Sequence, residues 1–276
     1  MGGPAIALAN PGAAPGEQFT FKLSMGPIVG GRARMSIGSV KYAGKSGNML
    51  SVRAQAEGAP WVQLVAKMQD DYSLVVDPQS LLPLEVIEIE HGGNERRIQV
   101  TITSRNVEID LQMHKTKQHL KRVMPTEVHD PLSAYFAIRA LALNEGERIT
   151  LDILDGNSLW RSTVVVSHIK KLMLDENGPN PRAVPAILLS GTSTRIDDTG
   201  KPMPVPPRKA RIWLSEDSLR TLLRLEADTK LGLAALELTS YEATASARKK
   251  IGSGTLAKVP GVTVMSSDQL PHWDRP

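Results

Sequence analysis

Apolar and polar residues alternate with a period of two over much of this chain, and this pattern most narrows the folds open to it. Residues 98–103 read Ile-Gln-Val-Thr-Ile-Thr, and residues 107–113 read Val-Glu-Ile-Asp-Leu-Gln-Met. Successive side chains of a strand point to opposite faces, so each segment predicts a strand with one buried and one polar face. Ser104-Arg105-Asn106 between them is typical of a tight hairpin turn.

The same alternation, or apolar runs bounded by turn residues, predicts roughly a dozen strands in all. The other predicted strands lie at residues 19–25, 49–55, 61–68, 87–90, 149–153, 160–169, 186–190, 210–214, 222–227 and 234–239. Asp77-Pro78, the His-Gly-Gly-Asn stretch at 91–94, and Asp155-Gly156-Asn157 are typical of turns. The sequence therefore predicts a mainly β fold: an antiparallel curved sheet or barrel-like domain with one main short helix.

One segment departs from the alternation and predicts that helix. Asp130 can cap the free N–H groups of a first turn, and Pro131 sits where a missing N–H costs nothing. Leu132, Tyr135 and Arg139 then recur at three- and four-residue spacing. This spacing gives the helix one face that can pack on a sheet.

Composition limits the classes of function. Of the 276 residues 41% are hydrophobic but only 4% aromatic, so aliphatic side chains must fill the core. The net charge is +4, and no basic run is interleaved with aromatics, so we expect no nucleic-acid partner. The chain has no cysteine, which excludes thiol catalysis and cysteine-bound metals. No apolar run approaches the ~20 residues of a membrane-spanning helix, so we expect no transmembrane segment.

The chain divides into three parts by composition. Residues 1–16 are rich in Gly, Pro and Ala and form either a flexible leader or a signal remnant, because Ala7-Leu8-Ala9 has the small-x-small pattern of a signal-peptidase site. Residues 17–241 carry the alternation and predict a β-rich domain. Residues 242–276 lose the alternation and predict a C-terminal tail.

The best polar constellation is formed by Asp130, Tyr135 and Arg139 on the predicted helix. One interpretation is structural: Asp130 caps the helix, and Arg139 pairs with a carboxylate and anchors the helix across a barrel mouth. The other makes Arg139 a receptor for an anionic ligand headgroup. We assign Tyr72 and Trp213 to the same ligand-binding site, although such aromatic residues belong more often to a core or its rim.

No pattern in the sequence predicts a catalytic residue, a metal site or a cofactor. Ser133 lies in a helical first turn rather than in a GxSxG elbow, and no HExxH set occurs. His114 and His119 are spaced so that they cannot share a metal on a strand or a helix. Asp70, Asp71 and Asp77 suggest paired carboxylates, but turn capping with one ion pair is the simpler interpretation.

Several short motifs follow one another in a fixed order: Pro15-Gly16-Glu17 with Phe19-Thr20-Phe21, Asp71-Tyr72 with Asp77-Pro78 and Leu81-Leu82-Pro83, His129–Leu141, Asn144–Glu147, and Ile212–Asp217 with Leu225-Glu226. In order and spacing they resemble the bacterial family catalogued as domain of unknown function 3108. The resemblance runs from about 15 to 240. It implies a secreted or outer-envelope β protein with no established activity.

These observations together predict a non-enzymatic periplasmic or outer-envelope protein. The first expectation is that it binds a lipid or other hydrophobic ligand inside a barrel-like sheet. The alternative is a protein–protein scaffold or interaction module in the envelope, and the third is a hydrolase acting on envelope material. A continuous apolar cavity would favour the lipid binder, whereas a filled core with an exposed apolar edge would favour the scaffold.

Overall fold

The computed structural model describes residues 12–59, 69–91, 95–176, 178, 180–229, 232–251 and 259–266. Within these residues fifteen strands form one sheet, accompanied by two short helices. The strands are β1 (Glu17–Met25), β2 (Ile28–Lys41), β3 (Asn48–Gly58), β4 (Gln69–Val76), β5 (Pro83–His91), β6 (Arg96–Thr103), β7 (Asn106–Met113), β8 (Thr116–Val123), β9 (Arg148–Asp155), β10 (Ser158–Leu174), β11 (Arg182–Ile196), β12 (Arg208–Ser215), β13 (Leu222–Thr229), β14 (Gly232–Ala243) and β15 (Val262–Met265). The helices are α2 (Pro131–Arg139) and α3 (Ala245–Ile251).

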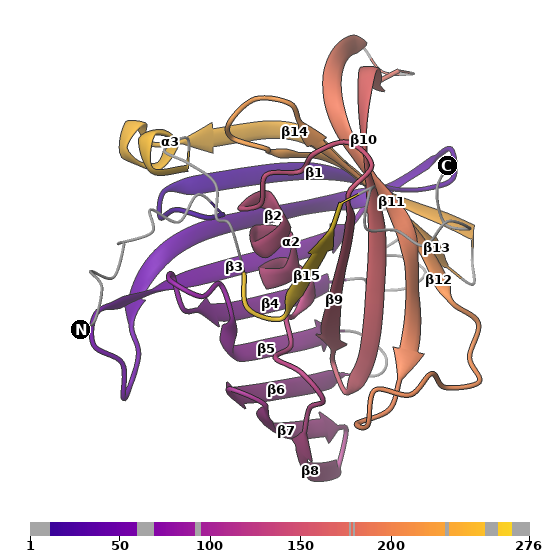
Figure 1. The fold of residues 1–276 in the computed structure, drawn as a ribbon. Helices are drawn as coiled ribbons and strands as arrows, with labels where there is room; N and C mark the ends of the chain where they lie inside the picture. Colours follow the sequence, from indigo (N-terminus) through magenta and orange to yellow (C-terminus); the bar gives the residue numbers. More distant parts are fainter. Residues whose placement is uncertain are drawn as a thin grey trace.

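The sheet is antiparallel and open, with strand order β15-β9-β10-β11-β12-β13-β14-β1-β2-β3-β4-β5-β6-β7-β8. Strands β1–β8 follow one another in chain order, and so do β9–β14 (Figure 1). The two runs join where β1 pairs with β14, which places Phe21 opposite Leu238. The predicted antiparallel curved sheet is confirmed, and β8 and β15 are its two edges within the described residues.

The hairpin of β6 and β7 forms as the alternation predicts. Val100 faces Ile109 across the two strands, and both side chains are buried. The polar residues that flank Val100 and Ile109 along each strand point to the other face of the sheet. Ser104 in the turn adopts a φ of 57°, and the chain reverses within two residues.

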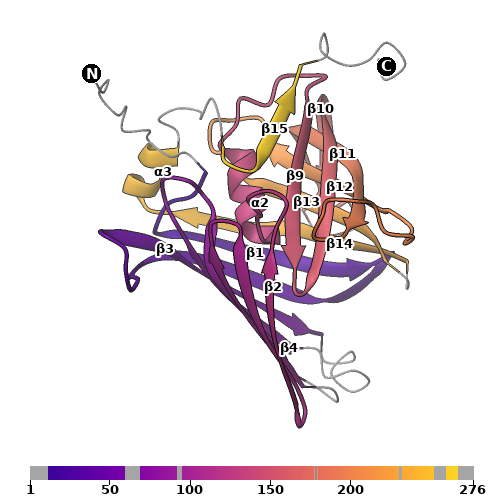
Figure 2. The ribbon, with the colours of Figure 1, turned by 60° about the horizontal axis from the view of Figure 1, so that its bottom comes forward.

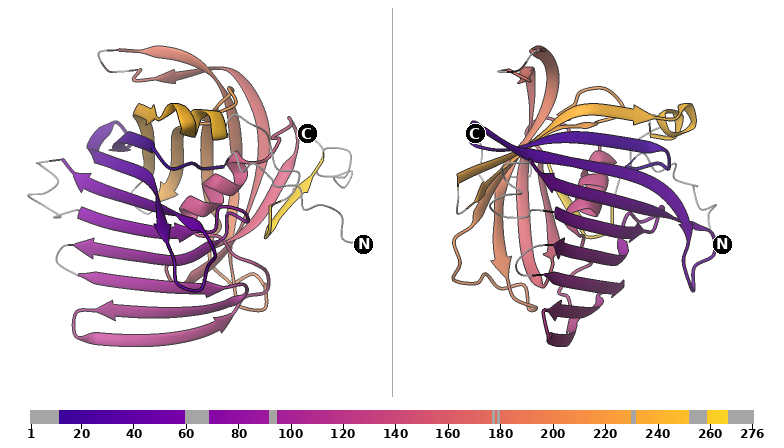
Figure 3. Two further views of the ribbon diagram at one scale, coloured as in Figure 1. Left: turned by 90° about the vertical axis from the view of Figure 1, so that its left-hand side faces the viewer. Right: turned by 180° about the vertical axis from the view of Figure 1, so that it is seen from behind.

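Helix α2 fills the concave side of the sheet. Figures 2 and 3 show it between the run β1–β8 and the run that begins with β9. Asp130 caps the helix and Pro131 opens it, as predicted. Every residue from Ser133 to Arg139 is buried, and Leu132 packs partly buried against the same core. The helix is therefore enclosed by the sheet, rather than lying on it by one face.

Four strands are not predicted by the alternation: β2, β4, β8 and β15. Glycines at three positions of β2 weaken its pattern, and β8 is polar on both faces because it is rich in lysine and arginine. The expectation that Asp70 and Asp71 cap turns is wrong, since both lie within β4. Asp77 does cap a turn, where its carboxylate accepts the N–H groups of Gln79 and Ser80.

The predicted strand at 61–68 and most of the predicted turn at 91–94 lie outside the described residues. Within the range predicted as a C-terminal tail, β15 pairs with β9, and α3 packs through Ala247 and Ile251 against Ala14. Among the described residues, no helix is both long and apolar enough to cross a membrane.

Candidate functional site

The start of α2 brings two of the predicted site residues together. The Asp130 carboxylate accepts the backbone N–H groups of Leu132 and Ser133 at 2.9 and 3.2 Å. Tyr72 on β4 donates its hydroxyl to the same carboxylate at 2.8 Å. Burial and the neighbouring Asp130 charge hold the pKa of Tyr72 well above its usual range, so the hydroxyl keeps its proton and its donor role.

The space beside this contact is very small. A cavity of about 10 Å³ lies between the helix start and strands β4–β6, and the turn after β9 closes it. Tyr72, Glu88, Asp130 and Asp155 line it together with apolar side chains. A volume near 10–15 Å³ holds about one water molecule. Burial raises the pKa of Glu88, which agrees with a site largely closed to solvent.

Arg139 lies at the other end of α2 as part of a buried ion pair. Its guanidinium is 2.8 Å from the carboxylate of Glu17, and both side chains are 0% exposed. The rings of Phe19 and Tyr135 flank the guanidinium at 5.9 and 5.8 Å. Arg139 also donates to the carbonyl oxygen of Leu219. The charge of Arg139 is thus neutralised inside the protein. This agrees with the structural interpretation, in which Arg139 pairs with a carboxylate.

Tyr135 lies beside Arg139 and is also part of this packing. Its hydroxyl oxygen accepts the backbone N–H of Leu222 at 3.1 Å, which ties α2 to β13. Burial raises the pKa of Tyr135 to about 12. Two separate clusters therefore lie along α2. One joins Asp130 to Tyr72, and the other contains Tyr135 and Arg139.

A buried histidine that the sequence analysis did not single out lies next to Ser133. The Oγ atom of Ser133 is 3.4 Å from Nδ1 of His129, and both residues are 0% exposed. Ser133 also completes the helix cap, because its Oγ accepts the N–H of Asp130. Burial lowers the pKa of His129, so this imidazole stays neutral. A Ser–His contact sealed from solvent and engaged in a cap has no access to a substrate.

Trp213 is a buried residue of β12, and its side chain shares a strand face with Arg211 and Arg224 rather than with Ile212 and Leu214. Arg211 and Arg224 contact its ring at 5.4 and 5.9 Å. Its ring contacts thus differ from those of the cluster of Asp130 and Tyr72 and from those of the cluster of Tyr135 and Arg139. Instead Trp213 adjoins a group of paired charges that we call the outer network, which comprises Lys22, Asp175, Arg211, Arg224, Glu226 and Glu237.

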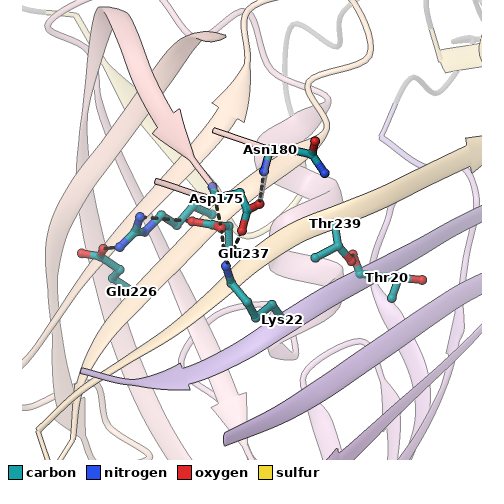
Figure 4. A network of polar contacts seen from close by, with 8 residues as sticks. Thr20, Lys22, Asp175, Asn180, Glu226, Glu237 and Thr239 are labelled. Atoms are coloured by element: carbon teal, nitrogen blue, oxygen red, sulfur yellow. Dashed lines mark hydrogen bonds and ion pairs between the residues drawn. The ribbon is translucent and has the colours of Figure 1, made fainter. Parts of the chain in front are cut away.

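The outer network fastens the long β10–β11 hairpin to the sheet (Figure 4). Lys22 on β1 lies 3.2 Å from Asp175 in the hairpin and 3.1 Å from Glu237 on β14. The backbone N–H of Asp175 donates to the Glu237 carboxylate at 3.0 Å. Burial opposes the charge of Lys22, but its hydrogen bonds to Glu237 and Asp175 outweigh this and raise its pKa.

Three cations and three carboxylates make up this network, so its charges balance internally. The ion pairs and the Asp175 hydrogen bond explain how the hairpin is held.

Beside the outer network lies a cavity of about 460 Å³ between β11, β12, β13 and β14. It is lined in part by Lys209, Arg211, Glu226 and Asp228. The residues that line this cavity again carry both signs of charge. Within the described ranges, no group of three or more His, Cys, Asp or Glu side chains could hold a metal ion.

Strand β8 presents a free backbone edge. Within the described part of the chain it pairs with β7 alone, and residues 116–119 are exposed. Met124, directly after β8, donates its N–H to the carbonyl oxygen of Arg105 and so continues the register of the pair. Because backbone groups alternate in direction along a strand, the N–H groups of Lys117 and His119 point away from β7.

The side chains of β8 carry a positive excess. Lys121 and His119 pair with Glu108 and Asp110 on β7, both at 2.8 Å. Lys115, in the preceding turn, and Lys117 form no ion pair with any described residue. The free edge is thus an extended backbone bordered by uncompensated positive charge.

Comparison with known proteins gives a family but no activity. Residues 18–239 match the family described as "Protein of unknown function (DUF3108)". The chain matches none of the curated proteins. A solved beta-barrel-like protein of domain of unknown function DUF1849 from Brucella abortus aligns with a TM-score of 0.49 and 13% identity, covering 84% of this chain and 99% of that one. A "putative lipoprotein" from Parabacteroides distasonis aligns with a TM-score of 0.34 and 7% identity, covering 83% and 96%.

Proposed function

Because the chain belongs to the DUF3108 family, whose description assigns no activity, we propose a function from the geometry of its surfaces. The protein acts as a non-enzymatic interaction module of the bacterial envelope. It binds a partner protein that adds an extended segment to the free edge of β8. Such strand addition gives affinity through main-chain hydrogen bonds and selectivity through side chains.

The observation that carries this proposal is the contrast between the interior and the edge. The concave side of the sheet is occupied by α2, whose Phe136 and Ala137 are 0% exposed. The interior cavity beside Asp130 measures about 10 Å³, whereas ligand pockets measure about 300–1,000 Å³. An acyl chain inside the sheet is therefore less well supported than a partner at its edge.

The charge of the edge indicates the chemistry of the partner segment. Lys115 and Lys117 are unpaired among the described residues, and His119 and Lys121 lie on the same stretch. Lysines on an edge strand discourage pairing with another copy of the same strand, because like charges would face each other. An acidic segment meets no such repulsion. We therefore assign the partner segment an extended, acidic character.

An envelope location is supported by sequence features. Ala7-Leu8-Ala9 has the small-x-small pattern of a signal-peptidase site, and the family resemblance implies secreted relatives. The partner is accordingly sought among envelope proteins.

Two variants of one residue separate a backbone role of β8 from a side-chain role. His119→Ala removes the imidazole and keeps the N–H that points away from β7. His119→Pro removes that N–H without removing a ladder bond to β7. The full chain and both variants are cross-linked in cells, recovered from the envelope fraction and compared for the protein they capture.

We expect the alanine variant to retain its partner and the proline variant to lose it, with both folding as judged by circular dichroism. A recovered partner should also slow amide exchange at Lys117 and His119. Equal capture by both variants, or a partner that leaves these amides unprotected, would contradict strand addition at β8.

A further inference from the structure

A second surface with unpaired positive charge lies on a different part of the sheet. A groove of about 580 Å³ runs across β1, β2, β3 and β4, which lie side by side (Figure 3). Its polar lining residues are Gln18, Thr20, Arg34, Ser36, Arg53, Gln55, Asp71 and Ser73. These residues alternate with Phe19, Met35 and Tyr72, which belong to the inner core. The polar residues therefore lie on the outer face of the sheet.

Strand register places the two arginines of this groove next to each other. One row across the strands reads Gln18, Ser36, Arg53 and Ser73. The neighbouring row reads Thr20, Arg34, Gln55 and Asp71. Arg34 and Arg53 are therefore diagonal neighbours on adjacent strands, about 7–8 Å apart at the backbone. Long guanidinium side chains can converge on one group from such positions.

The charges of the two arginines are not compensated. Both are exposed, and neither forms an ion pair or a hydrogen bond with another described residue. Arg122, Arg161 and Arg211, by contrast, each pair with a carboxylate.

The one carboxylate in the groove is already occupied. Asp71 accepts hydrogen bonds from Gln55 and His91, both at 2.8 Å, and these lower its pKa. Arg34 and Arg53 thus present positive charge in a hollow that contains hydroxyl and amide groups.

We propose that this groove binds a phosphoryl group through Arg34 and Arg53. A guanidinium presents parallel N–H donors that match the spacing of phosphoryl oxygens, and such charge-assisted bonds are stronger than neutral ones. The hydroxyls of Thr20, Ser36 and Ser73 line the same groove and supply further donors. The phosphoryl group belongs either to a soluble phosphate or to a lipid headgroup. This site is independent of β8 and goes beyond the proposed interaction with a partner protein.

The test uses the full chain and three variants with the same change of charge. Arg34→Gln and Arg53→Gln alter the groove, and Arg182→Gln alters an exposed arginine of β11 outside it. Inorganic phosphate is titrated calorimetrically at low ionic strength, because salt screens exposed charges. Flotation with phosphatidylcholine vesicles, with and without phosphatidic acid, then distinguishes a lipid source from a soluble one.

We expect each groove variant to bind about tenfold more weakly or worse, and Arg182→Gln to bind like the unaltered chain. Phosphate binding identifies a soluble ligand, and binding only to phosphatidic acid vesicles identifies a headgroup; both outcomes support the site. Equal weakening in all three variants, equal binding to neutral vesicles, or no binding of either probe would overturn it. Unfolding midpoints in urea confirm that the variants are folded.

Discussion

At the scale of single residues, the sequence predicts local contacts better than distant ones. The cap formed by Asp130 follows from residues within one helical turn, so the pattern reveals it. The partner of Arg139 is Glu17, which lies at the start of β1, far away in the chain. No local spacing could indicate that pair. The same limit applies to Trp213, whose neighbours Arg211 and Arg224 are set by the pairing of β12 with β13.

The pair of Arg139 and Glu17 makes a prediction about stability. Arg139→Met leaves Glu17 as a buried carboxylate without its cation, so the free energy of unfolding should fall by about 3–5 kcal/mol. Adding Glu17→Gln to this variant should recover part of the loss. Lys121→Ala, which breaks an exposed pair with Glu108, is the control and should leave the urea midpoint unchanged. A midpoint of Arg139→Met close to that of the control would contradict a structural role.

At the scale of elements, strands were predictable where one face is apolar. β6 and β7 follow the alternation closely because their inner residues meet the core. The alternation does not predict β8, because this strand carries polar side chains on both faces. It does not predict β2, because glycines interrupt the pattern there. Helix α2 was placed correctly from its cap. Its complete burial was not predictable, since it results from the sheet curving around it.

The enclosure of α2 makes a prediction about packing. Phe136 is 0% exposed within the concave side of the sheet. Phe136→Ala should lower the free energy of unfolding by about 3–5 kcal/mol through the cavity it leaves, and Phe136→Leu should cost clearly less. Denaturant titration followed by circular dichroism measures both. Similar small losses for the two variants would mean that the helix is not packed as described.

At the scale of the whole molecule, the mainly antiparallel sheet and its family were both predictable from the sequence. The order of the strands was not, because β1 lies beside β14 through contacts between opposite ends of the domain. The sheet curves around α2, and this helix occupies the concave side in which the lipid-binding expectation places a ligand. The surfaces on which unpaired positive charge gathers among the described residues are the edge of β8 and the groove that contains Arg34 and Arg53.

The central claim is that the interior is packed and that binding takes place on the surface. It is tested most directly by titrating the full chain with a neutral fluorescent acylglycerol, a probe that has no anionic group for the groove of Arg34 and Arg53. Because α2 occupies the concave side, we predict no saturable change in fluorescence. Saturable binding in the micromolar range, with one probe per chain, would contradict the account.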